Sequence, residues 1–442
     1  MKTMRRSTFR ITASICLLLI FTASFAGGKD LQETFTWKYN INRDARVTME
    51  NYNCNLSIHT WDKGEAEFKL TIDADTKSDE EAAIFEKYLR ELVFSNSPSS
   101  LFLRSRLWET ATTFISINTT SIKLSNGKTI SLHSLNIKGE LWIPSGCRFD
   151  LKSKYSQVTM EDFNGLLTLD LYNDNYTGSK VSSDLVITDK YSSIDLTDTK
   201  NIKASLYSSK LNAGNTSNLS IESKYSRISI VSCGILSANS YNDKYEIAKT
   251  GDVTFTAKYS DLKTESSGNL RIDLYSGNLI TGQAGDVSIV SKYSGYQFAV
   301  AGRCTITSAY KDKLTAGKLT SLEIEESKYT TLRIDNLTES VKDSDSYKDS
   351  FTISDTGTQF RELNLNGKYI KASLTIANTT GYRFRAKIKY ADLDINESSF
   401  KPLVKIVDGS EVKYDAVKGT ESEGMPLIEV NGYEVNLKII EK

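Results

Sequence analysis

The sequence is poor in histidine and proline and has no excess of charge of either sign. Its 442 residues include only 2 His and 4 Pro, and the 55 basic residues equal the 55 acidic ones. Two histidines leave little room for a His-based metal site or for several His-dependent catalytic steps. A chain without net positive charge lacks the basic stripe that nucleic-acid binding requires. These absences argue against a nucleic-acid partner and against a histidine-ligated metal cofactor.

Long apolar runs are also missing, and the one short run lies at the start of the chain. Basic residues precede the apolar segment from Ile15 to Phe21, and the small residues Ser24 and Ala26 stand at positions −3 and −1 of an expected cleavage site. This is the pattern of a secretory signal peptide, predicted for residues 1–26. No later run approaches the roughly 18 apolar residues of a spanning helix, so no transmembrane segment is expected after the signal is removed. The prediction is an exported protein.

Four cysteines follow the predicted signal: Cys54, Cys147, Cys233 and Cys304. Their spacing contains no CxxC pair and no Cys/His pattern typical of zinc. Export permits disulfides, and four cysteines allow three pairings. A chain of this length does not need such cross-links, however, and we expect buried free thiols that pack as small apolar side chains.

Tyrosine is abundant, with 23 residues against 17 Phe and 4 Trp, and most of it follows a repeat. Similar neighbours surround tyrosines that recur about every 16 to 22 residues, and every second one is preceded by Lys. The repeating tyrosines are Tyr155, Tyr172, Tyr191, Tyr207, Tyr225, Tyr241, Tyr259, Tyr275, Tyr293, Tyr310, Tyr329, Tyr347, Tyr369 and Tyr390. A fixed period of this kind predicts a stack of similar structural units.

Between the tyrosines, apolar and polar residues alternate with the period of a β-strand. Val253, Phe255, Ala257 and Tyr259 share one face, and Leu262 then falls on the opposite parity. A slip of one residue reverses the faces of a strand. Each tyrosine is therefore predicted to mark a corner, with the ring of a Lys-Tyr pair on the inward face. No proline occurs between residues 145 and 401, as expected of strands that are paired on both sides.

Short strands, sharp corners and a fixed period together predict a mostly-β fold, a parallel β-solenoid. Two coil lengths fit the repeat. A coil of about 17–18 residues, which we favour, aligns every tyrosine on one line and places Lys on every second coil, so that like charges are about 9.6 Å apart. A coil of about 34–36 residues would put the Lys-Tyr corners on the side opposite to the other tyrosines.

The two ends of the chain depart from the repeat. Ser78 begins a capping box, and apolar residues at helical spacing follow it to about Phe94, which predicts a helix that covers one end of the solenoid. The tyrosine period is lost after residue 396. The predicted organisation is a strand-plus-helix capping region at 27–146, solenoid repeats at 147–395 and a C-terminal cap at 396–442.

Parts of the capping region resemble a known family. The segment from Met49 to Ile72, with Trp61-Asp62-Lys63 at its turn, and the segment Gly139–Gly146 resemble the bacterial putative-adhesin family, whose relatives include head-GIN domains. The repeats depart from that family, because Lys-Tyr-Ser stands where relatives commonly carry Ser-Gly-Asp. The resemblance implies an exported, right-handed β-solenoid of the bacterial envelope with no known catalytic residues. Together with the signal peptide it predicts a location in the periplasm or on the cell surface of a bacterium.

Residues capable of catalysis are few and scattered. Neither His59 nor His133 stands near a Ser or Cys in a recognisable nucleophile motif. The paired carboxylates Glu161-Asp162, and Asp170 with Asp174, would serve a glycosidase only if the fold set them at the separation that such enzymes require, and solvated corners are the expected placement. No catalytic, cofactor-binding or metal-binding residue is therefore predicted.

The Lys-Tyr pairs are the candidate surface. Stacked aromatic rings flanked by cations can hold carbohydrate or polyanionic chains. The pairs are Lys154-Tyr155, Lys190-Tyr191, Lys224-Tyr225, Lys258-Tyr259, Lys292-Tyr293 and Lys328-Tyr329. The structural interpretation, which the inward parity favours, is that the rings seal the bends, and replacing Tyr259 by Ala should then cost about 3–5 kcal/mol of stability.

The function predicted from these features is that of a non-catalytic envelope protein, either structural or adhesive, whose partner is a cell-surface glycan or another envelope protein. The alternative is a lyase or glycosidase that acts on polysaccharides from a cleft along one flank of a β-solenoid.

Overall fold

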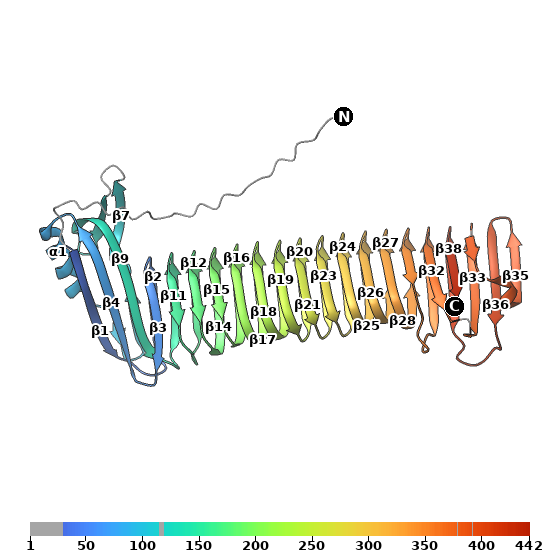
Figure 1. Ribbon diagram of the computed structural model, residues 1–442, viewed down its shortest axis with the longest axis horizontal. Coiled ribbons are helices and arrows are strands. Elements are labelled where there is room, and N and C mark those ends of the chain that lie inside the picture. The colour runs from blue at the N-terminus through green and yellow to red at the C-terminus, as the bar shows by residue number, and fades with distance from the viewer. Residues whose placement is uncertain (1–29, 115–118, 378, 391) are drawn as a thin grey trace, which may run out of the picture.

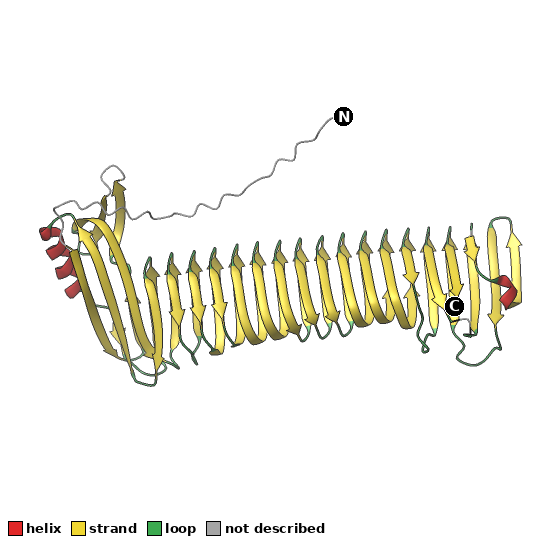
Figure 2. Cartoon of the chain, viewed as in Figure 1, coloured by secondary structure: helices red, strands yellow, loops and turns green. Residues whose placement is uncertain are grey.

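The computed structural model describes residues 30–114, 119–377, 379–390 and 392–442; the predicted signal peptide, residues 1–26, lies outside these ranges. The chain forms a β-solenoid of stacked parallel coils, as the repeat predicted, with a wider capping region at its N-terminal end (Figure 1 and Figure 2).

One coil spans the interval between successive tyrosines of the repeat. The parallel register places Phe149 beside Leu167 on the neighbouring coil, and Leu219 beside Leu236. The register continues in this way from coil to coil, which confirms the shorter of the two predicted coils and excludes the longer one.

Each coil has one sharp corner and one gentler bend. The strands fall into three groups: those that run toward the sharp corner, those that leave it, and those that continue through the gentler bend. Strands that run toward the sharp corner are β2 (Arg46–Tyr52), β10 (Arg148–Lys154), β12 (Leu167–Tyr172), β14 (Val181–Lys190), β16 (Thr199–Tyr207), β20 (Val253–Lys258), β22 (Leu270–Tyr275), β24 (Val287–Lys292), β27 (Ser327–Lys328), β29 (Ser346–Tyr347), β31 (Glu362–Lys368), β33 (Tyr382–Lys389) and β37 (Leu427–Tyr433). Strands that leave the corner are β3 (Asn55–Trp61), β11 (Gln157–Met160), β13 (Asn175–Gly178), β15 (Ser193–Leu196), β19 (Lys244–Thr250), β21 (Asp261–Ser266), β23 (Asn278–Gln283), β30 (Ser350–Ile353), β32 (Lys371–Ile376), β34 (Asp392–Asp394) and β38 (Asn436–Glu441). Five strands bend through the gentler side without a break, namely β17 (Lys210–Lys224), β18 (Arg227–Tyr241), β25 (Gly295–Tyr310), β26 (Lys313–Ile324) and β28 (Thr331–Asp343).

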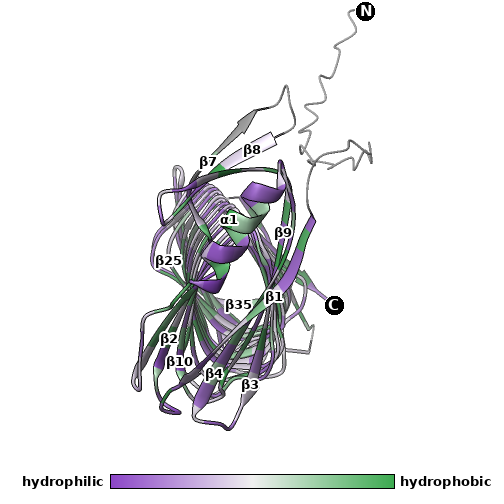
Figure 3. Ribbon diagram, turned by 90° about the vertical axis from the view of Figure 1, so that its left-hand side faces the viewer, coloured by the Kyte–Doolittle hydropathy of each residue, from purple (hydrophilic) through white to green (hydrophobic). Residues whose placement is uncertain are grey.

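The core runs the length of the stack between the two sheets, which face each other in the view along the axis (Figure 3). Alternate residues of each strand point inward: Val253, Phe255 and Ala257 of β20 are buried, whereas Thr254 and Thr256 are exposed. A single coil has no partner for its inner face, so each coil is stabilised by its two neighbours.

The N-terminal end is closed by an antiparallel sheet and a helix. Strands β1 (Asp30–Asn40) and β9 (Thr129–Pro144) both pair with β4 (Glu65–Thr76), and β9 also pairs in parallel with β3. Helix α1 (Asp79–Arg90) packs on this sheet, and its N-cap Ser78 accepts a hydrogen bond from the Glu81 backbone, as the capping box predicted. The capping region also contains β5 (Asn96–Ser97), β6 (Ser100–Arg104), β7 (Trp108–Phe114) and β8 (Thr119–Leu124).

The first coil lies within the segment predicted as a cap. Strands β2 and β3 pair in parallel with β10 and β11, so the stacked repeat begins near residue 46. Strand β6 pairs in parallel with the other side of β2.

The C-terminal segment predicted as a cap divides into two parts. Residues 400–418 form the hairpin of β35 (Phe400–Asp408) and β36 (Glu411–Lys418), preceded by the 3-10 turn η2 (Glu397–Ser399), and this hairpin pairs with β33 at the end of the stack. Strands β37 and β38, by contrast, form a coil that inserts between β31–β32 and β33–β34. The last residues of the chain therefore lie inside the stack rather than beyond it (Figure 1).

Candidate functional site

The sharp corner of every coil is made by one residue in the left-handed backbone region. Among the described residues, the sixteen non-glycine residues with positive φ (47–67°) are all corner residues. Every Lys-Tyr pair of the repeat places Tyr itself there, as at Tyr225 (φ 57°) and Tyr259 (φ 57°). In the coils between them the position is held by a smaller or polar residue such as Asn173 or Asn242, of the kind that adopts this conformation most readily.

The tyrosines therefore alternate between two columns. The register places Lys154 beside Tyr172, Tyr172 beside Lys190, and Lys190 beside Tyr207, so Tyr and Lys take turns in the column that precedes the left-handed residue. The other tyrosines, such as Tyr155, occupy the left-handed column itself. The prediction that Lys falls on every second coil is confirmed, whereas the prediction that all tyrosines share one line is wrong by one residue on alternate coils.

This offset explains the two-coil period of the sequence. Neighbouring rings meet edge to face, with interplanar angles of 71–87° and centroid distances of 5.3–5.8 Å along the row. Aromatic pairs favour this geometry, whereas identical positions on successive coils, about 4.8 Å apart, would set the rings parallel. We call the unbroken row of sixteen rings, from Tyr52 to Tyr390, the tyrosine ladder.

The rings of the ladder point outward. Tyr155, Tyr191, Tyr225 and Tyr259 are 45–48% exposed, while the residue after each of them is buried. The predicted inward orientation is therefore wrong. The cause of this error is the left-handed residue. Because the chain turns the corner at Tyr itself, Lys and Tyr both face outward, and the next inward-facing residue is the one that follows Tyr.

Lysine side chains accompany the rings along the whole edge. Lys154, Lys190, Lys224, Lys258 and Lys292 are exposed. Lys328 is half-buried, and its ammonium lies 2.6 Å from the Glu326 carboxylate.

Toward the C-terminal end, lysines also enter the left-handed column. Lys311 lies 5.4–6.0 Å from the centroids of three successive rings, and Lys348 lies 5.5–5.6 Å from three successive rings as well. These are cation–π distances. The structure thus brings all the predicted Lys-Tyr pairs onto one edge.

Two members of the ladder were not identified from the sequence. Tyr52 precedes Asn53, as Tyr172 precedes Asn173, and Tyr433 precedes Glu434 in the inserted coil. The motif of Tyr followed by a residue able to adopt positive φ was the available signal. In the structure Tyr433 lies between Tyr369 and Tyr390 and completes the row.

A buried row of polar side chains holds the backbone of most of the corners. The backbone N–H that follows the left-handed residue donates to a side chain of the next coil: Ser156 N to Asp174 Oδ1 (2.7 Å), Asp174 N to Ser192 Oγ (3.0 Å), and Ser226 N to Asp243 Oδ1 (2.6 Å). Because the corner breaks the regular ladder, these N–H groups would otherwise be buried without a partner. We call these side chains the corner spine; its described members include Ser156, Asp174, Ser192, Ser209, Ser226, Asp243, Ser260, Ser294, Asp312, Thr330 and Asp349.

We expect the replacement of a ladder tyrosine to cost less stability than the replacement of a buried neighbour. Tyr259→Ala removes two edge-to-face contacts of a half-exposed ring and should lower the free energy of unfolding by about 1–3 kcal/mol. Phe255→Ala, at a fully buried position of the same coil, should cost about 3–5 kcal/mol. Urea denaturation of both variants measures this; equal losses would mean that the ring is a core residue.

The corner spine makes stability depend on pH. Burial raises the pKa of Asp174 from 3.8 to about 6 and that of Asp343, which lies beside the spine, to about 7; it also raises the pKa of Asp312 and Asp349. Between about pH 4 and pH 7 the folded chain therefore holds protons that the unfolded chain has lost. The stability that these groups contribute is fully present below the unfolded pKa and falls as the pH rises through this window, by on the order of 3 kcal/mol for Asp174.

The measurement is the melting temperature at pH 5 and pH 8, with the higher value expected at pH 5. Asp174→Asn, which cannot ionise, should reduce the difference, and the part that remains should come from Asp343, Asp312 and Asp349. Below about pH 4 the paired carboxylates of Glu67 and Asp415, whose pKa values are lowered by Lys38 and Arg383, act in the opposite direction. A melting temperature that rises steadily from pH 5 to pH 8 would contradict the prediction.

The histidines and paired carboxylates do not assemble a catalytic constellation. His59 stacks on Trp142, with centroids 4.7 Å apart, and its Nδ1 lies 2.9 Å from Glu161 Oε1. Hydrogen bonds from His59 and the Thr60 backbone lower the pKa of Glu161. No described nucleophile takes part in this pair. His133, at a separate place, contacts Thr119.

Asp170 and Asp174 lie on opposite sides of the sheet. Asp170 is exposed, whereas Asp174 is only 2% exposed and accepts hydrogen bonds from two backbone N–H groups and from Ser153. The expectation that both occupy solvated corners is therefore wrong for Asp174. The two carboxylates do not form a pair of the kind that glycosidases use.

The cysteines are buried free thiols, as predicted. Burial raises the pKa of Cys54, Cys147 and Cys304 to about 12 and that of Cys233 to about 11. Within the described ranges, no group of three His, Cys, Asp or Glu side chains is placed to hold a metal ion, and no helix is long and apolar enough to cross a membrane.

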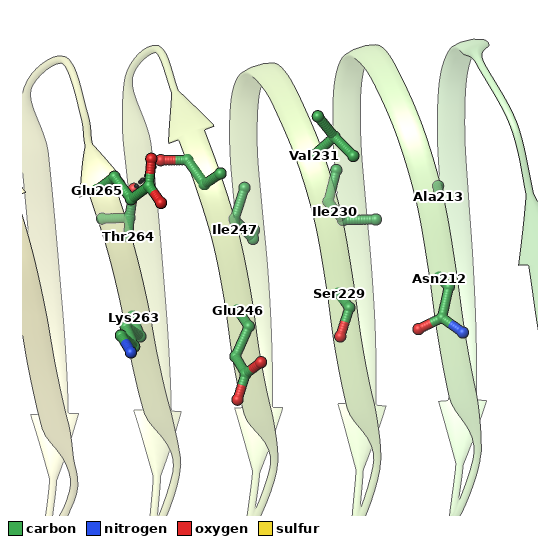
Figure 4. Close-up of a pocket in the computed structure, with 11 residues that line it drawn as sticks. Asn212, Ala213, Ser229, Ile230, Val231, Glu246, Ile247, Lys263, Thr264 and Glu265 are labelled. Carbon is green, nitrogen blue, oxygen red and sulfur yellow. Dashed lines mark hydrogen bonds between the residues drawn. The ribbon is translucent and has the colours of Figure 1, made fainter.

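Two of the hollows on the strands that leave the corner lie in the middle of the stack. One, of about 490 Å³, spreads over successive coils at Asn212, Ser229, Glu246 and Lys263 and is bordered by the exposed Val231 (Figure 4). Its Glu246 and Lys263 are in register and of opposite charge. The other, of about 540 Å³, borders the tyrosine ladder at Tyr191 and Tyr225.

No protein-family model matches the chain, and no curated protein matches it either. Among solved structures, the chain is similar to a putative cell adhesion protein from Clostridium sporogenes ATCC 15579, with 10% identity over 94% of this chain and 100% of that chain. The TM-score of this match is 0.16, too low to transfer a name or a role to this chain. The resemblance to bacterial putative adhesins stays a prediction made from residues 49–72 and 139–146.

Proposed function

We propose that this chain is an exported, non-catalytic binding protein of the bacterial envelope and that its tyrosine ladder binds a linear carbohydrate chain. The observation that carries the proposal is the row of sixteen tyrosine rings along one edge, several of them nearly half exposed. An exposed aromatic row of this length is unusual for a surface that serves folding alone, because exposed apolar patches favour association.

The geometry of the rings indicates the kind of ligand. Each ring meets its neighbours nearly at right angles, so its faces are partly covered, and nearly half of a residue such as Tyr225 (47%) stays exposed to solvent. Phenol hydroxyls donate and accept hydrogen bonds, and ring edges pack on C–H groups. A polyhydroxylated chain offers both kinds of partner repeatedly. Fifteen steps of about 4.8 Å give a binding edge of about 70 Å, which suits an extended ligand better than a compact one.

The test is the affinity of the purified chain for soluble glycans, measured by affinity electrophoresis and calorimetry with dextran as a neutral probe and polygalacturonate and heparin as acidic probes. The triple variant Tyr191→Ala/Tyr225→Ala/Tyr259→Ala should lower the affinity by about tenfold or more. A matched control, Ile235→Ala/Ile280→Ala/Val300→Ala, removes exposed apolar side chains away from the ladder and should bind as the wild type does.

The same incubations separate binding from catalysis. A binding protein leaves the length distribution of each glycan unchanged after prolonged incubation, whereas a lyase or glycosidase shortens it. Reproducible cleavage by the wild-type chain would overturn the non-catalytic proposal. Equal affinity of the wild type and the tyrosine variant for every glycan would show that the ladder is a structural device only.

A further inference from the structure

Three cations stand next to one another on successive coils beside the ladder. Lys210 is in register with Arg227, and Arg227 with Lys244, each at the first outward position after the corner spine. The coil spacing sets these positions about 4.8 Å apart. All three side chains are exposed. We call them the basic triad.

Such a column is unfavourable for folding, because like charges directly opposite each other on paired strands repel. Among the parallel strand registers of the described residues, no other column places three like charges on consecutive coils. Where two arginines do align, Arg46 beside Arg148, Asp150 lies between them at 2.5 and 3.6 Å. The basic triad has no such partner: none of its members forms an ion pair with a described residue.

An acid on the next coil offsets the charge of the triad at one end only. Asp261 is in register with Lys244 but forms no ion pair with it, and its Oδ1 accepts two hydrogen bonds from Asn278, on the coil beyond. No acid stands in register with Lys210 or Arg227. Repulsion that the fold offsets at one end only indicates a surface selected for something other than stability.

The triad lines the 540 Å³ hollow described above. Tyr191 and Tyr225 line it as well, with Ser208 between them in the left-handed column, and Ser193 stands next to Lys210 in the column of the triad. The left-handed column is occupied here by Ser208 and Asn242, whereas the equivalent residues farther along, Lys311 and Lys348, lie over the rings. Rings, hydroxyls and cations are thus accessible together in this part of the edge.

We propose that the basic triad and the adjoining tyrosines form a subsite for an acidic polysaccharide, a linear glycan that carries carboxylate or sulfate groups. The proposal rests on the function proposed above and names its ligand class. Arg227, at the centre, offers the planar fork that binds a carboxylate or sulfate through two parallel hydrogen bonds, and the two lysines add point charges on either side. The sugar hydroxyls would meet Tyr191, Tyr225 and the serines.

Single-stranded nucleic acid is also a polyanion, but the site fits it less well. Its bases bind to such grooves by stacking on free aromatic faces. In the ladder the faces of Tyr191 and Tyr225 are partly covered by the rings on either side, Tyr172, Tyr207 and Tyr241. The carbohydrate is therefore the ligand to which the geometry points.

The experiment compares two triple variants of equal net charge. Lys210→Gln/Arg227→Gln/Lys244→Gln removes the triad, and Lys203→Gln/Lys249→Gln/Arg271→Gln removes three exposed cations elsewhere on the coils. The triad variant should lose at least about tenfold in affinity for polygalacturonate or heparin at low salt, while the control variant should keep the wild-type affinity. The acidic glycan that binds more tightly identifies carboxylate or sulfate as the preferred group.

A second readout keeps the test independent of folding. Because the triad is repulsive, its removal should raise the melting temperature while acidic-glycan binding falls. Affinity for dextran should be unchanged in the triad variant and reduced in the tyrosine variant. The subsite is overturned if the triad variant binds acidic glycans as the wild type does, or if single-stranded DNA binds more tightly than any acidic glycan. A wild-type chain that binds no glycan at all overturns the proposed function as well.

Discussion

Deletion of residues 427–442 is expected to release the C-terminal end of the solenoid from the stack. These residues form β37 and β38, which pair with β31 and β32 on one side and with β33 and β34 on the other. Five of their apolar side chains are buried: Ile428, Val430, Val435, Leu437 and Ile439. At about 1.5–3 kcal/mol for each buried side chain, the deletion removes on the order of 10 kcal/mol of packing.

The loss should remain local. In a solenoid each coil is stabilised by its neighbours, so coils on the N-terminal side of β31 should keep their structure while residues 382–418 lose the strands that hold them. Limited trypsin digestion followed by mass spectrometry measures this. Cleavage should appear rapidly after Arg383, Arg385 and Lys387 in the truncated chain, and hydrogen exchange should accelerate over the same segment.

Deletion of Lys442 alone is the matched control. It removes one ion pair with Asp355, 2.9 Å long, and leaves both strands intact, so digestion should follow the wild-type pattern. Continued protection of residues 382–418 in the longer deletion would contradict the prediction. It would mean that β33 moves by one coil and pairs with β31 directly, and that the inserted coil is dispensable for order.

The sequence predicted the stack and the coil length because both are periodic properties. Residues one period apart carry the same character, and a period of this size has few structural explanations other than parallel coils. The order of the coils is not periodic in this sense. Tyr390 and Tyr433 both carry the corner signature, and nothing in their local sequences says that the later one stacks first. Only the pairing of β37 with two partners distant in sequence determines that order.

The orientation of the rings was mispredicted for a local reason. The alternation places Ala257 and Tyr259 on one face, as in a strand that continues, whereas a positive φ at Tyr259 ends the strand. The residue types at the corners did contain the needed information. Asn173 and Asn242 occupy the left-handed position on coils between the Lys-Tyr corners, and asparagine is typical of left-handed corners. The basic triad was also available in the sequence, since its members recur at the coil period, but it became visible only with the register.

The corner spine follows the same two-coil period as the tyrosine ladder. Where Tyr holds the left-handed position, the next residue is usually a serine, and where a smaller residue or Lys holds it, the next is often an aspartate. Asp174 and Asp243 therefore each lie between two serine-bearing coils and accept hydrogen bonds from one of them. The outward alternation of Tyr and Lys and the inward alternation of Ser and Asp are two sides of the same two-coil unit.

Replacement of Asp243 should be among the most destabilising changes in the chain. Its carboxylate is 1% exposed and accepts hydrogen bonds from the backbone N–H of Ser226 (2.6 Å) and of Tyr241 (3.1 Å) and from the hydroxyls of Ser223 and Ser240 (2.7 and 2.6 Å). In Asp243→Ala the hydroxyls can turn to other partners, but the two N–H groups are left buried and unpaired. We expect a loss of about 3–6 kcal/mol.

Asp243→Asn tests whether the acceptor atoms or the shape of the side chain matter. The amide keeps one oxygen for Ser226 but presents N–H donors toward the groups that bound the other oxygen, so an intermediate loss of about 1–3 kcal/mol is expected. Asp273→Ala, at an exposed aspartate farther along the stack, should change stability by less than about 0.5 kcal/mol. Urea denaturation of the three variants gives the ranking. Equal stability of Asp243→Ala and Asp273→Ala would mean that water enters the corner and replaces the carboxylate, and that the spine does not hold the backbone from which the tyrosine ladder projects.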